Sequence, residues 1–110
     1  LFLVTGSPGG PRIISTTLQA ILNVVDFGME IDEAVAAPRI HHQWIPHRVS
    51  VEEAVPEAVV EGLRARGHEI QSRRAWSAAE SIRVDAASGW HLGANDPRRD
   101  GLAVGYTQDP

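Results

Sequence analysis

The segment from residue 5 to residue 12 limits the fold of this chain more than any other part. It reads Thr-Gly-Ser-Pro-Gly-Gly-Pro-Arg, so three glycines and two prolines fall within eight residues. Gly9 and Gly10 have no Cβ, so their backbone can take positive φ and another group can approach it closely. Pro11 suits the first position of a helix, where its missing N–H costs no hydrogen bond. Because an apolar run precedes the segment at 1–4, we expect a short buried strand, a glycine turn and a helix start.

This turn is a candidate anion site. Free N–H groups of Gly9 and Gly10 would face a negative charge beside a helix N-terminus. Such a turn can hold a phosphate, a carboxylate or the oxyanion that develops during acyl transfer. The chain has no lysine, which excludes the Walker phosphate loop, and its glycine spacing does not match the dinucleotide-binding pattern. On spacing alone, a turn that only joins a strand to a helix is the commoner interpretation.

Residues 12–27 have the pattern of an amphipathic helix. Apolar side chains recur at helical spacing at Ile14, Leu18, Ile21 and Val25. Ile13, Leu22 and Val24 widen this stripe, so we expect a well-buried helix. Gly28 follows the last apolar position and is expected to end it.

The remainder of the chain alternates short helical and extended patterns. We expect helices at 32–37 and 57–66, an extended segment at 40–44, strands at 49–51 and 68–72, a polar loop at 71–76, a hairpin of 81–86 and 90–94 around Ser88 and Gly89, a charged loop at 96–100, and a strand or tail at 102–106. This order lacks the regular alternation of a parallel α/β sheet. The expected fold class is therefore α+β, a mostly antiparallel sheet with helices on one face, resembling one layer pair of a larger sandwich.

Composition and charge narrow the function classes. The 110 residues fit one small domain or fragment, and the net charge is −4 with all ten basic residues arginine, which gives no support for nucleic-acid binding. There is no cysteine, and no apolar run approaches the ~20 residues of a membrane span. Since the chain starts with Leu1 rather than methionine, we expect a processed or excised piece of a longer protein.

His41, His42 and His47 are the candidate metal ligands or general bases. No carboxylate or cysteine lies at ligand spacing from them, so we expect structural histidines. Arg73 and Arg74 would suit a carboxylate, but exposed arginines in a solvated loop are the commoner case.

Three segments resemble the γ-glutamyltransferase (γ-glutamyltranspeptidase) family. They are Gly-Ser-Pro-Gly-Gly-x-Arg-Ile at 6–13, Ala-Ala-Pro-Arg-Ile-His-His-Gln-Trp at 36–44, and Asn-Asp-Pro-Arg-Arg at 95–99 followed by Gly-Tyr at 105–106. They occur in the family's order and span nearly the whole chain. The resemblance implies an N-terminal nucleophile hydrolase with an αββα sandwich, a zymogen that cleaves itself so that a threonine begins the small subunit. Residues 1–110 resemble only the C-terminal part of that subunit.

The resemblance also implies an activity and a site. The family transfers the γ-glutamyl group of glutathione or related amides to water, an amino acid or a peptide, without a metal or cofactor, and its bacterial members are usually periplasmic or extracellular. Gly9 and Gly10 match the family's backbone oxyanion pair, so they are the expected catalytic and substrate-binding residues. The threonines of this chain are internal, namely Thr5, Thr16, Thr17 and Thr107. We therefore expect the nucleophile upstream and no activity in the chain alone.

The expected partner is the upstream portion of the same precursor, that is, the large subunit and the N-terminal part of the small subunit. Without it, the chain would expose apolar surface and self-associate. Two positions depart from the family pattern: Pro11 and Asn95 stand where serine is common. They leave open a sibling acylase of the cephalosporin or glutaryl type, and a non-catalytic binding domain with the same core remains a further alternative.

Overall fold

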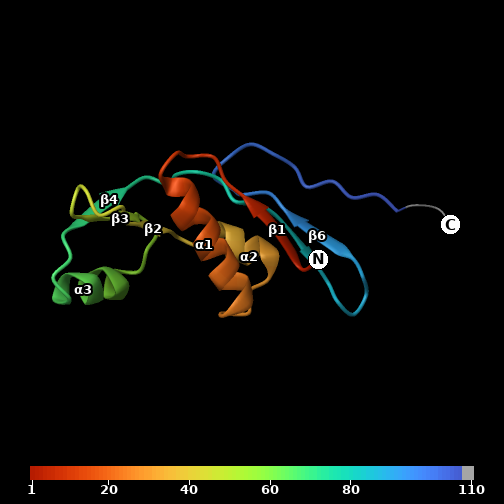
Figure 1. Ribbon diagram of the computed structural model, residues 1–110, viewed down its shortest axis with the longest axis horizontal. Helices are drawn as coiled ribbons and strands as arrows, with labels where there is room; N and C mark the ends of the chain where they lie inside the picture. Colours follow the sequence, from red (N-terminus) through yellow and green to blue (C-terminus); the bar gives the residue numbers. More distant parts are fainter. Residues whose placement is uncertain (108–110) are drawn as a thin grey trace.

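The computed structural model describes residues 1–107 of the chain. Its elements are, in order, β1 (Leu3–Gly6), α1 (Arg12–Val25), α2 (Ile31–Ala36), β2 (Ile40–His41), β3 (Val49–Glu52), α3 (Glu57–Ala65), β4 (Ile70–Arg73), β5 (Glu80–Val84) and β6 (His91–Ala94). The molecule is elongated, with one three-stranded sheet on either side of α1 and α2 (Figure 1).

The first sheet has the strand order β1-β5-β6 and is antiparallel throughout. α1 and α2 pack against it and form the larger core with small and branched side chains, namely Ala20, Val24, Ile31, Ala34, Val35, Ala79 and Ala94. Because four of these seven side chains are alanine, both helices can lie close to the strands.

The second sheet has the order β2-β3-β4, and its β3 and β4 strands are parallel. A parallel pair needs a crossover connection, and α3 provides it. Val60 on α3 packs with Val49 and Val51 on β3 in a second, smaller core. One face of this sheet is therefore apolar and covered by α3.

The opposite face of the second sheet is polar and lies against the start of α1. The strand register places His41 opposite Ser50 and Ser50 beside Gln71, so these three residues form a row across the sheet. Ser15 Oγ on α1 lies 2.8 Å from His41 Nδ1. Gln19 on α1 both donates to the carbonyl of Ile40 (2.8 Å) and accepts from its amide (2.9 Å). α1 thus joins the two sheets.

The structure confirms the predicted α+β class and the positions of α2, β3, α3 and the β5–β6 hairpin. Three predicted details were wrong. The strands form two sheets rather than one. β4 continues to Arg73, so the predicted polar loop begins as strand. Of the extended segment predicted at 40–44, only 40–41 form a strand, and Trp44 has φ of 71°, outside the extended region. Residues 101–107 belong to no helix or strand, so they are the tail rather than the strand.

The predicted burial of the first strand was also wrong. Leu1, Phe2 and Val4 are 92%, 50% and 48% exposed. The reason is topological: β1 is an edge strand with β5 as its one neighbour in the sheet, and α1 covers only part of it.

α1 carries more apolar surface than this chain covers. Its buried side is formed by Thr16, Ala20 and Val24, which recur at a spacing of four. Of the apolar stripe predicted to be buried, Val24 is buried, but Ile14, Leu18 and Val25 face outward and are exposed by 76%, 51% and 58%. Small side chains make most of the close contact with the core, and these three large side chains are left largely uncovered by residues 1–107. No helix in this described part of the chain is long and apolar enough to cross a membrane.

We expect the chain on its own to self-associate through this exposed side of α1, because contiguous apolar surface is costly in water. The double substitution Ile14→Glu/Leu18→Glu should shift sedimentation velocity profiles to monomer without lowering the melting temperature, since both side chains are exposed. Ala58→Glu, on the exposed side of α3, is the control for added charge. Equal association of all three proteins would contradict the assignment of this surface.

Candidate functional site

The glycine turn between β1 and α1 takes the backbone path expected from its sequence. Gly9 and Gly10 have φ of 130° and 58°, both outside the range that side chains favour. Their carbonyls accept the first helical bonds, from the amides of Arg12 (3.2 Å) and Ile13 (3.1 Å). Pro11, with φ −63° and ψ −18°, is the N-cap rather than the first helical residue, one position from the prediction.

The amides of Gly9 and Gly10 have no hydrogen-bond acceptor in the described part of the chain. Among residues 1–107, neither the N–H of Gly9 nor that of Gly10 donates to a backbone or side-chain acceptor. Pro11 has no N–H to compete with them. The turn therefore presents two donors at the start of a helix, which is the arrangement that anions bind.

Ser77 forms the wall behind Gly9. A Cβ built at Gly9 would overlap Ser77 Oγ, so a side chain at position 9 would have to displace the Ser77 hydroxyl and would also be strained at the positive φ of this residue. Ser77 is only 7% exposed, has φ of 59°, and its Oγ has no hydrogen-bond partner in the described structure. A serine held at positive φ needs support from its surroundings.

That support comes from the backbone of residues 76–79, which is fixed by buried charged side chains. Arg39 Nη1 donates to the carbonyl of Trp76 (3.1 Å), and the Trp76 amide donates to Glu52 Oε1 (3.1 Å). Two residues after Ser77, the Ala79 amide donates to Asp96 Oδ2 (2.7 Å). Bonds on both sides thus hold Ser77 against the glycine turn.

These side chains form one ion network. Arg39 pairs with Asp96, and Arg98 pairs with both Glu52 (2.5 Å) and Asp96 (3.1 Å). The four side chains are at most 9% exposed. Two carboxylates and two guanidinium groups cancel in charge, as buried ions require.

The same network closes the C-terminal end of α2. Arg39 Nη2 donates to the carbonyl of Val35 (2.7 Å), and Arg98 donates to the carbonyls of Val35, Ala36 and Ala37. These are the carbonyls that a helix leaves unpaired, and positive charge there also suits the helix dipole.

The surroundings of Asp96 lower its pKa. Burial by itself would raise the pKa of this carboxyl, but bonds from the Arg39 side chain, the amides of Arg98 and Ala79, and the Arg98 side chain outweigh that effect. Asp96 therefore carries its negative charge in the native state, as the pairing with two arginines requires.

The histidines have structural contacts in this chain. Both ring nitrogens of His41 are taken, by Ser15 Oγ (2.8 Å) and Gln43 Oε1 (2.9 Å). His42 stacks edge-on with His47 and His68. Within residues 1–107, no three His, Asp or Glu side chains gather as a metal site would need.

Sequence reasoning did not assign a role to the charged network or to Ser77. The charged loop predicted at 96–100 begins with a fully buried residue, Asp96, and the predicted polar loop ends at the buried Trp76. The signal available was Arg39 in the segment 36–44 together with Asp96 and Arg98 in the segment 95–99, since charged residues that become buried are normally paired.

We expect Asp96→Asn to destabilise the fold by about 3–5 kcal/mol, because it leaves the Arg39 and Arg98 charges without their shared carboxylate. That is a large part of the free energy of unfolding of a typical domain, which is ~5–15 kcal/mol. Denaturant unfolding followed by circular dichroism measures it. Asp100→Asn, in the same loop but exposed, is the matched control, and similar behaviour of both variants would refute the structural role of the network.

The second prediction for Asp96 concerns pH. We expect its carboxyl to titrate below its ordinary value of 3.8 in carbon-detected NMR. Since the native pKa is depressed, the stability that Asp96 contributes is present above that ordinary value and is lost as pH falls through the native pKa. A midpoint at or above 3.8 would mean that burial outweighs the arginine pairs.

Comparison with known proteins agrees with the family resemblance of the three sequence segments. The family model for γ-glutamyltranspeptidase matches residues 1–106. A glutathione hydrolase proenzyme of Escherichia coli (strain K12) is 43% identical over 106 residues, covering 96% of this chain and 18% of that relative. An acylase ACY 1 proenzyme of Pseudomonas sp. (strain SE83) is 42% identical over 101 residues, covering 90% and 17%.

Solved structures of similar proteins have the same fold as this chain. The T380A mutant of Helicobacter pylori γ-glutamyltranspeptidase superposes with a TM-score of 0.83 at 40% identity, over 89% of this chain and 54% of the matched chain. The α+β fold described above is thus a portion of the N-terminal nucleophile hydrolase fold, and the chain spans about a fifth of the curated relatives that it matches. The chain belongs to the γ-glutamyltranspeptidase family.

Proposed function

We propose that this chain is the C-terminal segment of the small subunit of a γ-glutamyltransferase, and that Gly9 and Gly10 supply the backbone donors of its oxyanion hole. The observation that carries the proposal is the glycine turn: two amide groups without a partner among residues 1–107, at a helix start, on a backbone path that only glycine adopts easily. A wall of fixed backbone behind Gly9 limits the motion of the turn, as preorganised donors require.

The proposed reaction divides between this chain and the segment before it. An N-terminal threonine upstream attacks the γ-glutamyl carbonyl, with its own α-amine as the base. The N–H groups of Gly9 and Gly10 donate to the oxygen that becomes negative in the tetrahedral intermediate. This intermediate collapses by breaking the C–N bond: the departing amine takes the proton that the α-amine removed from the threonine hydroxyl, and the γ-glutamyl group remains as an ester on the threonine. Water or an amine then attacks this ester and releases the threonine hydroxyl. The chain alone has no such threonine at its start and is proposed to be inactive.

Two observations support an upstream partner. The relatives are proenzymes several times longer than this chain, which covers 18% of the E. coli protein. The large side chains of α1 and β1 are exposed here, among them Ile14, Leu18 and Val4. Apolar side chains at helical spacing are what a further layer of the same protein would cover.

A sibling acylase is the second candidate, and the acylase relative from Pseudomonas supports it with 42% identity. The glycine turn would serve either enzyme, because both acyl transfers develop an oxyanion. Paired assays with a γ-glutamyl anilide and a glutaryl anilide separate the two. Turnover of only the γ-glutamyl compound supports the transferase, and preference for the glutaryl compound supports the acylase.

The glycine turn is tested by a matched pair of substitutions. Gly10 and Gly28 have similar φ, 58° and 64°, and a Cβ at either would meet no atom within 4 Å. Alanine therefore costs similar backbone strain at both positions. When the chain is co-expressed with the segment that precedes it in its precursor, we expect Gly10→Ala to lower kcat for γ-glutamyl anilide about 10²-fold. Alanine keeps its N–H, but it disfavours the positive φ that aims this N–H at the oxyanion, and losing one oxyanion donor has about this effect on rate.

Gly28→Ala, at the far end of α1, should retain nearly full kcat in the same assay. Mass spectrometry of the cleaved precursor confirms that only processed enzyme is compared, so that a defect in self-cleavage is not mistaken for slow catalysis. The chain expressed alone should show no turnover. Equal loss of kcat in both glycine variants, or activity in the chain alone, would contradict the proposal.

A further inference from the structure

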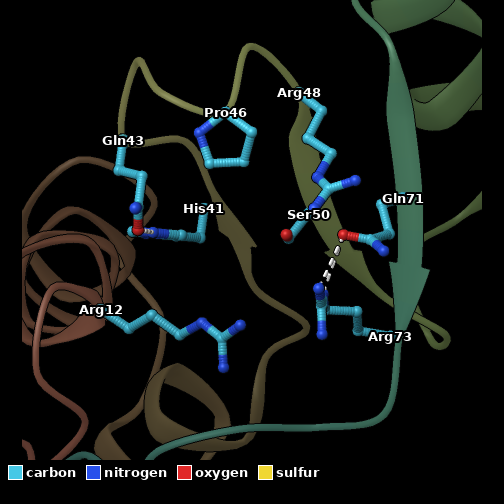
Figure 2. Close-up of a pocket in the computed structure, with 8 residues that line it drawn as sticks. All are labelled: Arg12, His41, Gln43, Pro46, Arg48, Ser50, Gln71 and Arg73. Carbon is cyan, nitrogen blue, oxygen red and sulfur yellow. Dashed lines mark hydrogen bonds between the residues drawn. The ribbon is translucent and has the colours of Figure 1, made fainter.

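A pocket of about 180 Å³ lies where the polar face of the second sheet meets the first turn of α1 (Figure 2). Its lining includes the row of side chains from β2, β3 and β4 described above and three arginines, Arg12, Arg48 and Arg73. The volume has room for several water molecules. None of its lining residues is acidic.

The three arginines carry charge that the described structure does not balance. The ion pairs formed among residues 1–107 use Arg39, Arg64, Arg83 and Arg98. Arg12, Arg48 and Arg73 pair with no carboxylate there. This concentration of positive charge stands out because the chain as a whole has a net charge of −4.

Two of the guanidinium groups are held in place. The Arg12 guanidinium carbon lies 5.2 Å from the centre of the Trp76 ring, a cation–π contact. Arg73 donates from Nε (3.1 Å) and Nη2 (2.8 Å) to Gln71 Oε1, the bond drawn in Figure 2. Groups fixed before binding lose less conformational entropy when a ligand arrives.

The polar groups of the pocket are mainly donors. Ser50 is 8% exposed, and its hydroxyl makes no hydrogen bond within residues 1–107. His41 is engaged through both ring nitrogens and is not free to bind a metal. Guanidinium groups and a hydroxyl, without a carboxylate, select an anion with several acceptor oxygens rather than a cation.

We propose that this pocket binds a small phosphate-type dianion, either free phosphate or the end of a phosphate monoester. Arg12, Arg48 and Arg73 neutralise the charge and donate to its oxygens, and the Ser50 hydroxyl adds a further donor. Gly9 and Gly10 are not among the lining residues of this pocket, and phosphate binding there does not depend on the enzyme activity proposed above.

Isothermal titration of the 110-residue chain with inorganic phosphate, at constant ionic strength set with NaCl, tests the site. We expect saturable binding at a single site. Arg73→Gln should weaken it about tenfold, because one charge-assisted donor is lost. Arg74→Gln, the exposed neighbour outside the pocket, should leave it unchanged and is the matched control.

Arg48→Gln is the second variant, since the Arg48 side chain makes no hydrogen bond within residues 1–107 and its loss should not affect folding. It too should weaken phosphate binding about tenfold, with an unchanged circular dichroism spectrum. Phenyl phosphate distinguishes the two forms of the ligand: binding as tight as phosphate supports an ester end group, and weaker binding supports the free ion. Non-saturable heats, or equal affinity of the wild type and both pocket variants, would overturn the proposal.

Discussion

The buried network of Arg39, Asp96, Arg98 and Glu52 is the interaction on which the rest of this structure depends. It connects four separate parts of the chain: the end of α2, strand β3, the segment before β5, and the loop after β6. The two apolar cores among residues 1–107 are small, so hydrophobic contacts alone would not fix how these parts meet. Because the charges are buried, any arrangement that separates them leaves an ion without compensation.

The network also explains how an exposed turn can be well positioned. The glycine turn belongs to the N-terminal edge of the first sheet, far in sequence from residues 95–98. Its wall, Ser77, lies in the segment that Arg39, Glu52 and Asp96 hold by its backbone. Arg12, at the first position of α1, lies over the neighbouring Trp76. The oxyanion hole proposed for this turn would require donors that do not move, and the support of the turn comes from ions rather than from a large core.

The sequence predicted local structure well wherever the signal itself was local. The positive φ of Gly9 and Gly10, the ends of α3 at Pro56 and near Gly67, and the turn at Ser88 and Gly89 follow from the properties of glycine and proline. Burial was predicted poorly, because an apolar stripe on a helix does not say whether the surface that covers it belongs to the same chain. Ile14 and Leu18 lie on such a stripe and are exposed among residues 1–107. The parallel pairing of β3 with β4 and the meeting of Arg39 with Asp96 depend on contacts distant in sequence, which periodicity does not encode.

The claim that Gly9 and Gly10 face the developing oxyanion is tested most directly by NMR. The chain, labelled with ¹⁵N-glycine, is assembled with the segment that precedes it in its precursor, and a tetrahedral γ-glutamyl boronate is added to mimic the intermediate. We expect the amide proton signals of Gly9 and Gly10 to move downfield, as new hydrogen bonds form, while those of Gly28 and Gly67 stay in place. An inhibited, boronate-bound complex in which Gly9 and Gly10 do not shift would contradict it.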